Sequence, residues 1–441
     1  MRAILKAMLV QVLVALPLAC ISCSASGSGA DGSSDVDSGI GPEQDAGLGE
    51  GVPGDFDGSG PDSSEDHSID DPYDTSRIEL VETVHRQGYT ADYYENRAYT
   101  CGRRGYQTFL VVYPDGLSRD VKRPLWVRMH GGGVGAFDDS GNYVPAEFLD
   151  EMPSLDQEYT EKLAQAAFEK GLVAGILAHP AGFRLLLPSM CDHDTYSGVG
   201  IPELNNPFSP DENGKPRAAD GLLATQAAID YTRSHYASTH VFLHGTSAGS
   251  IGAFSVAYAL ERKGLRLSGV VSDSHMMGKG LLDNAVLGCM PFPYDPDLVI
   301  PKIGPLATLE YAPDVLVRTG EFTVPIYHIW NRGDRSCCGN TEYEYTDDSG
   351  QTYSEPGCWH EHKAFHRAVV DNPPGGPGVS VSVELCVNGE GVSTPMACNK
   401  HSPTKMSADT PNPPGDQLRG GSDYNRAVLD WVNERLKDPV P

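Results

Sequence analysis

Basic residues are scarce in this chain of 441 residues, which carries 33 Lys and Arg against 60 Asp and Glu, giving a formal net charge of −27. A polyanion of this size repels phosphate backbones and anionic lipid headgroups. The composition therefore excludes nucleic-acid binding through a general basic surface, and no nucleic-acid partner is expected.

Long hydrophobic runs and paired cysteine motifs are also missing. The apolar run at residues 7–18 is too short to cross a bilayer as a permanent helix. Among the eight cysteines beyond the first 23 residues no Cys-x-x-Cys pair exists, so a zinc site of the usual spacing is not expected. No internal repeat is visible. We expect neither a metal nor a cofactor.

The negative charge is concentrated near the N-terminus. Residues 24–76 hold 14 acidic residues and no Lys or Arg, and 26 of these 53 positions are Gly, Ser or Pro. Such a segment cannot bury enough apolar surface to offset its ordering entropy. We expect a disordered acidic linker here. The remainder from Arg77 on has a net charge of only −15, from 31 basic and 46 acidic residues.

The first 23 residues have the features of a secretory signal, with Arg2 and Lys6 before the apolar run. Cys20 and Cys23 follow small residues, an arrangement that resembles the lipobox of bacterial lipoproteins, where such a cysteine is lipidated. The alternative is an ordinary cleaved signal. The predicted organisation is a signal at 1–23, a linker at 24–76 and a catalytic domain at 77–441.

One stretch of the linker approaches the spacing of a calcium-binding loop. Its acidic, Ser and Gly residues fall near the expected ligand positions. Any Asp-, Gly- and Ser-rich stretch produces such matches by chance, so calcium binding remains open. The residues concerned are Asp55, Asp57, Ser59, Gly60 and Asp66.

Eight cysteines lie beyond the signal region, an even number that predicts disulfides in an exported domain. The sequence does not choose among the pairings, although Cys386 and Cys398 would close a short loop. The candidates are Cys101, Cys191, Cys289, Cys337, Cys338, Cys358, Cys386 and Cys398.

Apolar runs alternate with amphipathic stretches after Arg77, which predicts a mostly parallel sheet covered by helices on both faces. We expect strands at 108–113, 125–129, 172–178, 241–244, 267–271, 325–330 and 379–387. Helices are expected at 155–170, 218–236, 248–263, 360–370 and 422–436. The Gly- and Pro-containing stretches at 181–217, 284–323 and 335–356 are expected as insertions over the carboxyl edge, where such folds bind ligands.

The motif Gly245-Thr246-Ser247-Ala248-Gly249 follows an expected strand and precedes an expected helix. That context is required of a nucleophile elbow, a turn so sharp that only glycine fits two residues before and two residues after the serine. The motif therefore predicts Ser247 as a nucleophile. A glycine-rich turn without chemistry is the alternative.

A second motif, His130-Gly131-Gly132-Gly133, follows the expected strand that ends at Met129. Its glycines let backbone N–H groups turn toward a developing oxyanion, and the amide after the nucleophile supplies another donor. We expect an oxyanion hole of Gly132, Gly133 and Ala248. With both motifs in this order, the chain resembles the α/β-hydrolase superfamily of serine esterases over most of residues 77–441.

This resemblance implies a catalytic acid and a histidine after Ser247, in that order. Asp334 follows the expected strand 325–330, at the family's usual acid position, and Asp273 after the preceding strand is the alternative. Of the four later histidines, His401 lies between the last strand and the last helix, where the family has its base.

The remaining late histidines fall in the expected helix 360–370, where they are expected to be surface or packing residues. His360, Glu361 and His362 do not predict a shared metal, because alternate positions on a helix point apart. The three histidines are His360, His362 and His366.

Several pieces resemble the pectin acetylesterase and Notum-like carboxylesterase group, namely the triple glycine, the elbow, Cys191-Asp192 followed by Gly198, and Cys398 shortly before His401. Two features depart from that group. Val134-Gly135 replaces its usual Trp-Cys, and the acid motif differs. The acid segment is equally similar to secreted polyester depolymerases and feruloyl esterases.

The sequence as a whole predicts an exported, lipid-anchored, monomeric serine esterase that uses an acyl-enzyme intermediate. The expected partner is an ester substrate, either a small molecule or a polysaccharide, and the membrane is contacted only through the N-terminal anchor. Three alternatives remain open: a serine peptidase, a polyester or feruloyl esterase, and a surface binding module without catalysis.

Overall fold

The computed structural model describes residues 68–102, 105–132, 134–144, 171–274, 311–331, 334, 342–346, 352–385 and 420–440. The chain divides into two compact units, Met1–Asp62 and Ser63–Pro441, and every described residue belongs to the second. The expected signal, both candidate lipidation cysteines and the possible calcium loop lie outside the described residues.

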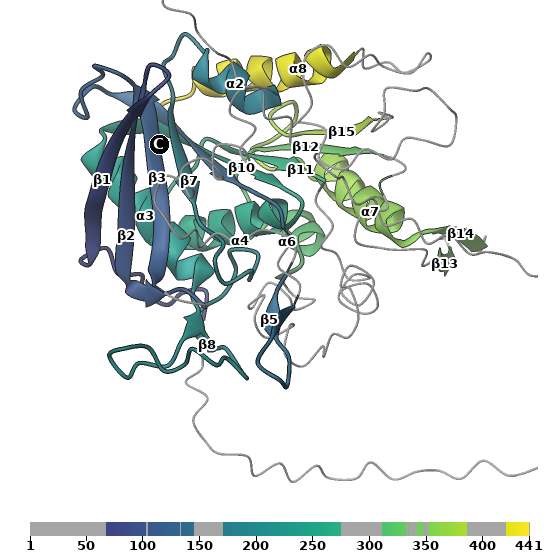
Figure 1. The fold of residues 1–441 in the computed structure, drawn as a ribbon. Coiled ribbons are helices and arrows are strands. Elements are labelled where there is room, and N and C mark those ends of the chain that lie inside the picture. Colours follow the sequence, from purple (N-terminus) through teal and green to yellow (C-terminus); the bar gives the residue numbers. More distant parts are fainter. Residues whose placement is uncertain are drawn as a thin grey trace, which may run out of the picture. The chain divides into compact units, whose positions relative to one another are not determined.

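A nine-stranded sheet forms the centre of this unit (Figure 1). Its order is β1 (Ile78–Arg86), β2 (Tyr89–Thr100), β3 (Tyr106–Pro114), β7 (Arg184–Pro188), β4 (Arg123–Met129), β10 (Ser238–Thr246), β11 (Gly269–Asp273), β12 (Ile326–Asn331) and β15 (Val381–Leu385). The first three strands are antiparallel, as is the β3–β7 pair, and all later neighbours are parallel. The expected mostly parallel sheet is confirmed.

Helices cover both faces of the sheet (Figure 1). On one face α2 (Gly171–Leu177) and α8 (Gly420–Arg435) pack around Trp126 and Phe242. On the other, α3 (Gly221–His235), α4 (Ala248–Arg262), α6 (Pro313–Thr319) and α7 (Gly357–Asp371) pack around the residues flanking these two in β4 and β10. Successive side chains of a strand point to opposite faces of the sheet. Each central strand is therefore buried on both faces, as its continuous apolar run predicts.

One expected strand is wrong. Residues 171–177 form helix α2, and the strand between β3 and β4 in the sheet is β7, which lies inside the stretch expected as an insertion. Periodicity cannot separate a short apolar run in a buried helix from one in a buried strand. In the structure this helix packs closely on α8, since a Cβ on Gly175 would lie 2.9 Å from Leu429.

Several elements were not anticipated. Strands β1 and β2 precede the first expected strand, and α6 and the hairpin of β13 (Glu342–Thr346) and β14 (Thr352–Pro356) lie inside expected insertions. Two short pairs, β5 (Ala136–Phe137) with β6 (Tyr143–Val144) and β8 (Ile201–Pro202) with β9 (Ala218–Ala219), flank the sheet. The other expected strands and helices are found within a few residues, except the helix at 155–170, which lies outside the described residues.

The end of the segment expected as a linker packs on the α/β unit. Ile69 is buried, Asp70 forms a 2.7 Å ion pair with Arg262 of α4, and the Asp74 N–H donates to the Tyr99 hydroxyl at 2.6 Å. The part of the chain that belongs to the folded unit therefore begins no later than Ser68.

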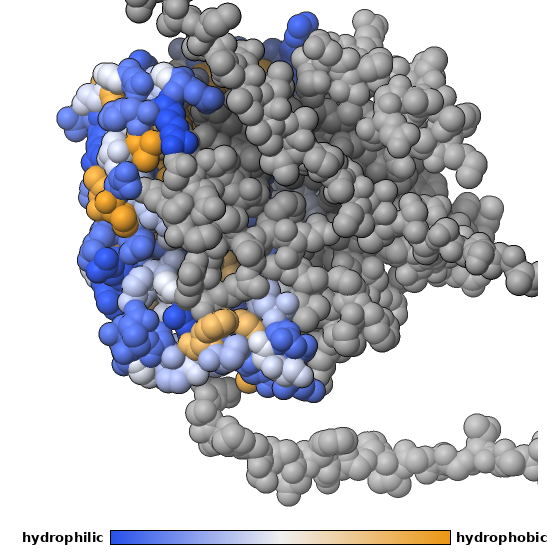
Figure 2. Space-filling model, viewed as in Figure 1, coloured by the Kyte–Doolittle hydropathy of each residue, from blue (hydrophilic) through white to orange (hydrophobic). Residues whose placement is uncertain are grey.

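On the face shown in Figure 2, the described surface is mostly hydrophilic, with separate small hydrophobic patches. Within the described ranges, the chain has no helix that combines the length and hydrophobicity needed to span a bilayer.

Candidate active site

Ser247 lies at a sharp turn between β10 and α4 at the carboxyl edge of the sheet. Its backbone has φ 54° and ψ −126°, a conformation that non-glycine residues rarely adopt. The turn is held by two bonds: the Ser247 N–H donates to the Asp273 carbonyl at 3.0 Å, and the Ser250 N–H donates to the Ser247 carbonyl at 2.8 Å. This strained turn is the geometry of a nucleophile elbow.

Both glycines of the motif are required by close approaches of the backbone. A Cβ on Gly245 would overlap the carbonyl of Gly249, and one on Gly249 would overlap the carbonyls of Met129 and His130. The expected reason for these glycines, crowding between strand and helix, is confirmed.

The triple-glycine loop passes directly beside the elbow. Strands β4 and β10 are neighbours, with Met129 paired to Gly245, so the two loops that follow them meet. A Cβ on Gly131 would lie 2.7 Å from the Ser247 Cβ and 3.4 Å from its Oγ. The structure thus brings together two motifs about 115 residues apart in sequence.

Two of the three expected oxyanion-hole residues are described. Ala248 begins α4, and as the first helical residue its N–H has no acceptor within the helix. Gly132 continues the loop from Gly131, and Gly133 lies outside the described residues.

Both candidate acids are buried at the carboxyl edge. Asp334 follows β12 and its N–H donates to the Asn331 carbonyl at 3.0 Å, while Asp273 ends β11 beside Thr246. The predicted base, His401, lies outside the described residues, so the predicted triad as a whole stays a prediction.

A buried arginine lies beneath the elbow. Arg128 of β4 donates from Nη2 to Thr246 Oγ1 at 2.9 Å and from Nη1 to the Met129 carbonyl. Burial lowers its pKa to about 10, while the charge of Asp273 acts in the opposite direction. The charge of Asp273 therefore favours the cationic form of the buried Arg128, an interaction that the sequence did not suggest. The sequence did contain one indication of this interaction, because Arg128 is a charged residue inside an otherwise apolar strand.

The structure forms one disulfide between the described cysteines, Cys101–Cys191. The only grouping of potential metal ligands among the described residues consists of this pair and Asp192, and the pair's sulfurs are already bonded to each other. Cys358 lies in α7, where its side chain is not described. Cys289, Cys337, Cys338, Cys386 and Cys398 lie outside the described residues.

Three histidines gather where β12, β15 and α7 meet. Nδ1 of His328 and Nδ1 of His366 lie 2.7 and 2.8 Å from the Ser382 hydroxyl, and His362 stacks on Trp330 at 5.5 Å. Burial lowers the pKa of His366. His362 and His366 thus make packing and hydrogen-bond contacts in the described unit, and His362 also lies 3.9 Å from the Asp334 carboxylate.

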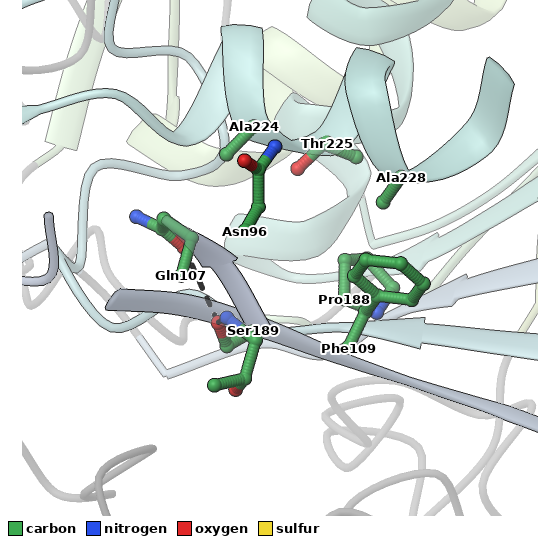
Figure 3. A pocket seen from close by; sticks show the side chains of 9 residues that line it. Asn96, Gln107, Phe109, Pro188, Ser189, Ala224, Thr225 and Ala228 are labelled. Carbon is green, nitrogen blue, oxygen red and sulfur yellow. Dashed lines mark hydrogen bonds between the residues drawn. The ribbon is translucent and has the colours of Figure 1, made fainter. Parts of the chain in front are cut away.

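A small hollow, partly open to solvent, lies between β3, Ser189 and α3 (Figure 3). Ser189 donates to Gln107 at 3.2 Å across its floor. Of the predicted catalytic residues that the structure describes, none lines it.

Fold and elbow together define the class. A mostly parallel sheet with helices on both faces, and a serine in a strained strand-to-helix turn at its carboxyl edge, constitute an α/β-hydrolase fold. The fold expected from the sequence is confirmed.

Comparison of the sequence with protein-family models and with curated proteins gave no match. Among solved structures, the chain is similar to Est1E from Butyrivibrio proteoclasticus, at 12% identity and a TM-score of 0.38, over 82% of this chain and 100% of that one. A glucuronoyl esterase from Solibacter usitatus is similar at 14% identity and a TM-score of 0.39, over 66% and 72% of the two chains.

A prolyl endopeptidase is similar at 13% identity and a TM-score of 0.36, over 80% of this chain. This chain spans only 39% of that protein. The strand order and the elbow, rather than these similarities, define the fold.

Proposed function

We propose that the protein is a serine hydrolase that cleaves carboxylic esters through an acyl-enzyme intermediate. The observation that carries this proposal is Ser247, held at positive φ with a glycine-rich loop against its side chain. No packing role explains why a serine should be strained at that turn, whereas a nucleophile must protrude there.

The proposed reaction follows from the position of each group. Ser247 Oγ attacks the ester carbonyl while His401 takes its proton, and the amides of Gly132, Gly133 and Ala248 stabilise the oxyanion. His401 then protonates the leaving alcohol. Water, activated by the same histidine, releases the acid, and Asp334 orients the imidazole throughout.

A fluorophosphonate probe tests the nucleophile. We expect labelling of the wild-type protein and its loss in Ser247→Ala, together with loss of p-nitrophenyl acetate hydrolysis. Ser234→Ala, at an exposed position on α3, is the matched control and should label normally. A folded wild-type protein that resists the probe would contradict the proposal.

The preference for esters over amides rests on the resemblance of the motifs to serine esterases. The substrate that we propose first is an acetylated polysaccharide. The protein would then be a polysaccharide deacetylase near the pectin acetylesterase group. Hydrolysis of p-nitroanilides without ester hydrolysis would instead indicate a peptidase. Turnover that is equal in wild type and His401→Ala would favour a binding module.

We also propose export with a lipid anchor at Cys20 or Cys23. The Cys101–Cys191 disulfide supports an oxidising compartment. Metabolic labelling with palmitate in a bacterial host should mark the protein and fail in only one of the variants Cys20→Ser and Cys23→Ser. Absence of label in the wild-type protein would contradict the lipid anchor and favour an ordinary cleaved signal.

A further inference from the structure

We propose that residues 191–198, here called the platform segment, hold the oxyanion loop in its reactive position, with Tyr196 as the main positioning residue. This inference rests on the proposed function and deepens it by assigning a role to a segment with no reacting group. The platform segment contacts both ends of the loop at 130–135.

The platform segment binds the oxyanion loop at its two ends. At the start, the His130 N–H donates to the Tyr196 hydroxyl at 3.2 Å, and the two rings pack edge to face at 5.9 Å. At the end, the Gly135 N–H donates to the His193 carbonyl at 3.0 Å. Gly131 and Gly132, which follow His130, have few conformational limits of their own. The position of these two glycines therefore depends on the fixed end at His130.

A second contact reinforces the far end. Tyr143 donates its hydroxyl to the Asp192 carbonyl at 3.2 Å, and its ring packs against His193 at 5.7 Å. The same hydroxyl lies so close to Gly135 that a Cβ there would overlap it. The end of the loop is thus enclosed by residues of two other segments.

Tyr196 is itself seated against the helix that carries the nucleophile. Its side chain is fully buried, and its ring lies against Gly252 of α4, where a Cβ would approach the ring's Cδ2 to 2.7 Å. Tyr196 therefore touches both the oxyanion loop and α4. Any shift of its ring changes the position of one relative to the other.

The platform segment is locally strained and needs support. His193, Thr195 and Tyr196 have φ of 47°, 57° and 57°, each costing on the order of 1 kcal/mol or more for a residue with a Cβ. Such a run persists only where surrounding contacts determine it. A strained segment so close to a proposed active site is consistent with a positioning function.

Asp194 supplies the first of these supports. Its buried carboxylate accepts three backbone N–H groups, those of Tyr196 at 2.9 Å, Gly198 at 3.0 Å and Gly221 at 2.7 Å. The last belongs to the first residue of α3, so the bond also joins the segment to a helix N-terminus. Hydrogen bonds to an ionised acceptor are stronger than neutral ones.

Asp192 and the disulfide supply the second support. Asp192 accepts the Gly102 N–H at 2.6 Å and Gln107 Nε2 at 2.5 Å, and Cys191 is bonded to Cys101. The start of the segment is thereby attached to the turn between β2 and β3. The platform segment is fixed on the rigid sheet on one side and on α3 and α4 on the other.

Tyr196→Phe is the decisive variant because it removes the acceptor of the His130 N–H and keeps the ring. We expect kcat for p-nitrophenyl acetate to fall about tenfold or more with KM within about twofold, since misplaced oxyanion donors weaken only the transition state. Tyr94→Phe is the matched control. It also loses a buried hydroxyl, which lies 2.6 Å from the Tyr236 hydroxyl, but it lies on β2. It should lower Tm and leave kcat unchanged.

Hydrogen exchange measured by mass spectrometry provides a readout that does not depend on catalysis. Peptides covering residues 130–135 should exchange faster in Tyr196→Phe, and to a smaller extent in Tyr143→Phe, than in the wild type or Tyr94→Phe. A folded Tyr196→Phe protein with unchanged kcat and unchanged exchange would overturn the inference. If the wild-type protein turned over no ester, the proposed function would be refuted. The hydrogen-exchange rates of residues 130–135 in the variants would still decide the role of the platform segment.

Discussion

Nε2 of His362 lies 3.9 Å from Oδ2 of Asp334, and both side chains are completely buried. The carboxylate that the sequence favoured as the catalytic acid is therefore enclosed by α7, which shields it from water and strengthens its interactions with neighbouring charges. Asp273, the alternative acid, is buried near a different partner, the guanidinium of Arg128. The two carboxylates should consequently respond differently to neutralisation.

We predict that Asp334→Asn lowers kcat by about 10⁴-fold, because an amide cannot hold the catalytic imidazole in the required tautomer. Asp273→Asn should instead lower the free energy of unfolding, since it removes a negative charge that favours the buried Arg128 cation, and should lower kcat less than tenfold. Steady-state kinetics and urea denaturation of both variants check this. The reverse pattern would make Asp273 the catalytic acid.

Gly131→Ala should abolish most activity without unfolding the protein. The new Cβ would lie 2.7 Å from the Ser247 Cβ and 2.9 Å from the Thr246 carbonyl, so either the loop or the elbow must move. A displacement of this kind costs about 100-fold in kcat/KM. Gly88→Ala is the control, since it has φ +82° and no atom within 4 Å of the new Cβ. It should lower Tm through backbone strain while kcat/KM stays unchanged.

Asp220 should make the protein less stable as pH rises. Burial raises the pKa of its carboxyl from 3.8 to about 7; Asp194 and Glu203 add to this and Lys215 opposes it. Between pH 4 and 7 the folded state keeps a proton that the unfolded chain has released, so stability falls across this window. The loss by pH 8 is on the order of 4 kcal/mol.

Asp220→Asn removes this dependence, and its backbone N–H can still donate to Asp192. The variant should match the wild type at pH 4 and exceed its free energy of unfolding at pH 8. Asp211→Asn provides a control of opposite sign, because the N–H of Lys215 and neighbouring donors lower the pKa of Asp211. That variant should be less stable than the wild type at pH 7, with the difference vanishing in acid. If the difference in free energy of unfolding between Asp220→Asn and the wild type did not change with pH, the prediction would be refuted.

The double variant Cys101→Ser/Cys191→Ser should lose about 2–5 kcal/mol of unfolding free energy, because the bond closes a loop over a sequence separation of 90. Through the platform segment it should also lower kcat. Urea denaturation and steady-state kinetics measure both effects. Wild-type protein treated with dithiothreitol should behave like the variant, and unchanged stability after verified reduction would contradict the assignment.

The sheet was largely predictable because its central strands are buried on both faces and read as apolar runs. Strand β1 escaped because most of its residues are exposed, which gives it no such run. Strand β7 escaped because Arg184 opens it and the apolar run before it, which forms α2, was chosen as the strand instead. Length and apolar content do not distinguish these two segments.

The elbow was predictable because its glycines report a local steric requirement. The supports around it were not, since Tyr196, Asp194 and Arg128 act through bonds to distant segments. The residues next to them in the sequence do not indicate which distant segments they bind. Asp194, for example, binds the N-terminus of α3 at Gly221, and only the assembled sheet makes this contact possible.

The strand order also has a kinetic consequence. Strand β4, which leads into the oxyanion loop, pairs with β7 and β10 rather than with β3, its predecessor in the chain. Pairings between segments so far apart in sequence are intrinsically slow to form, because loop-closure entropy must be overcome first. The loop and the nucleophile can meet only after the middle of the sheet has assembled. During refolding, the return of activity should therefore lag behind the recovery of helical signal.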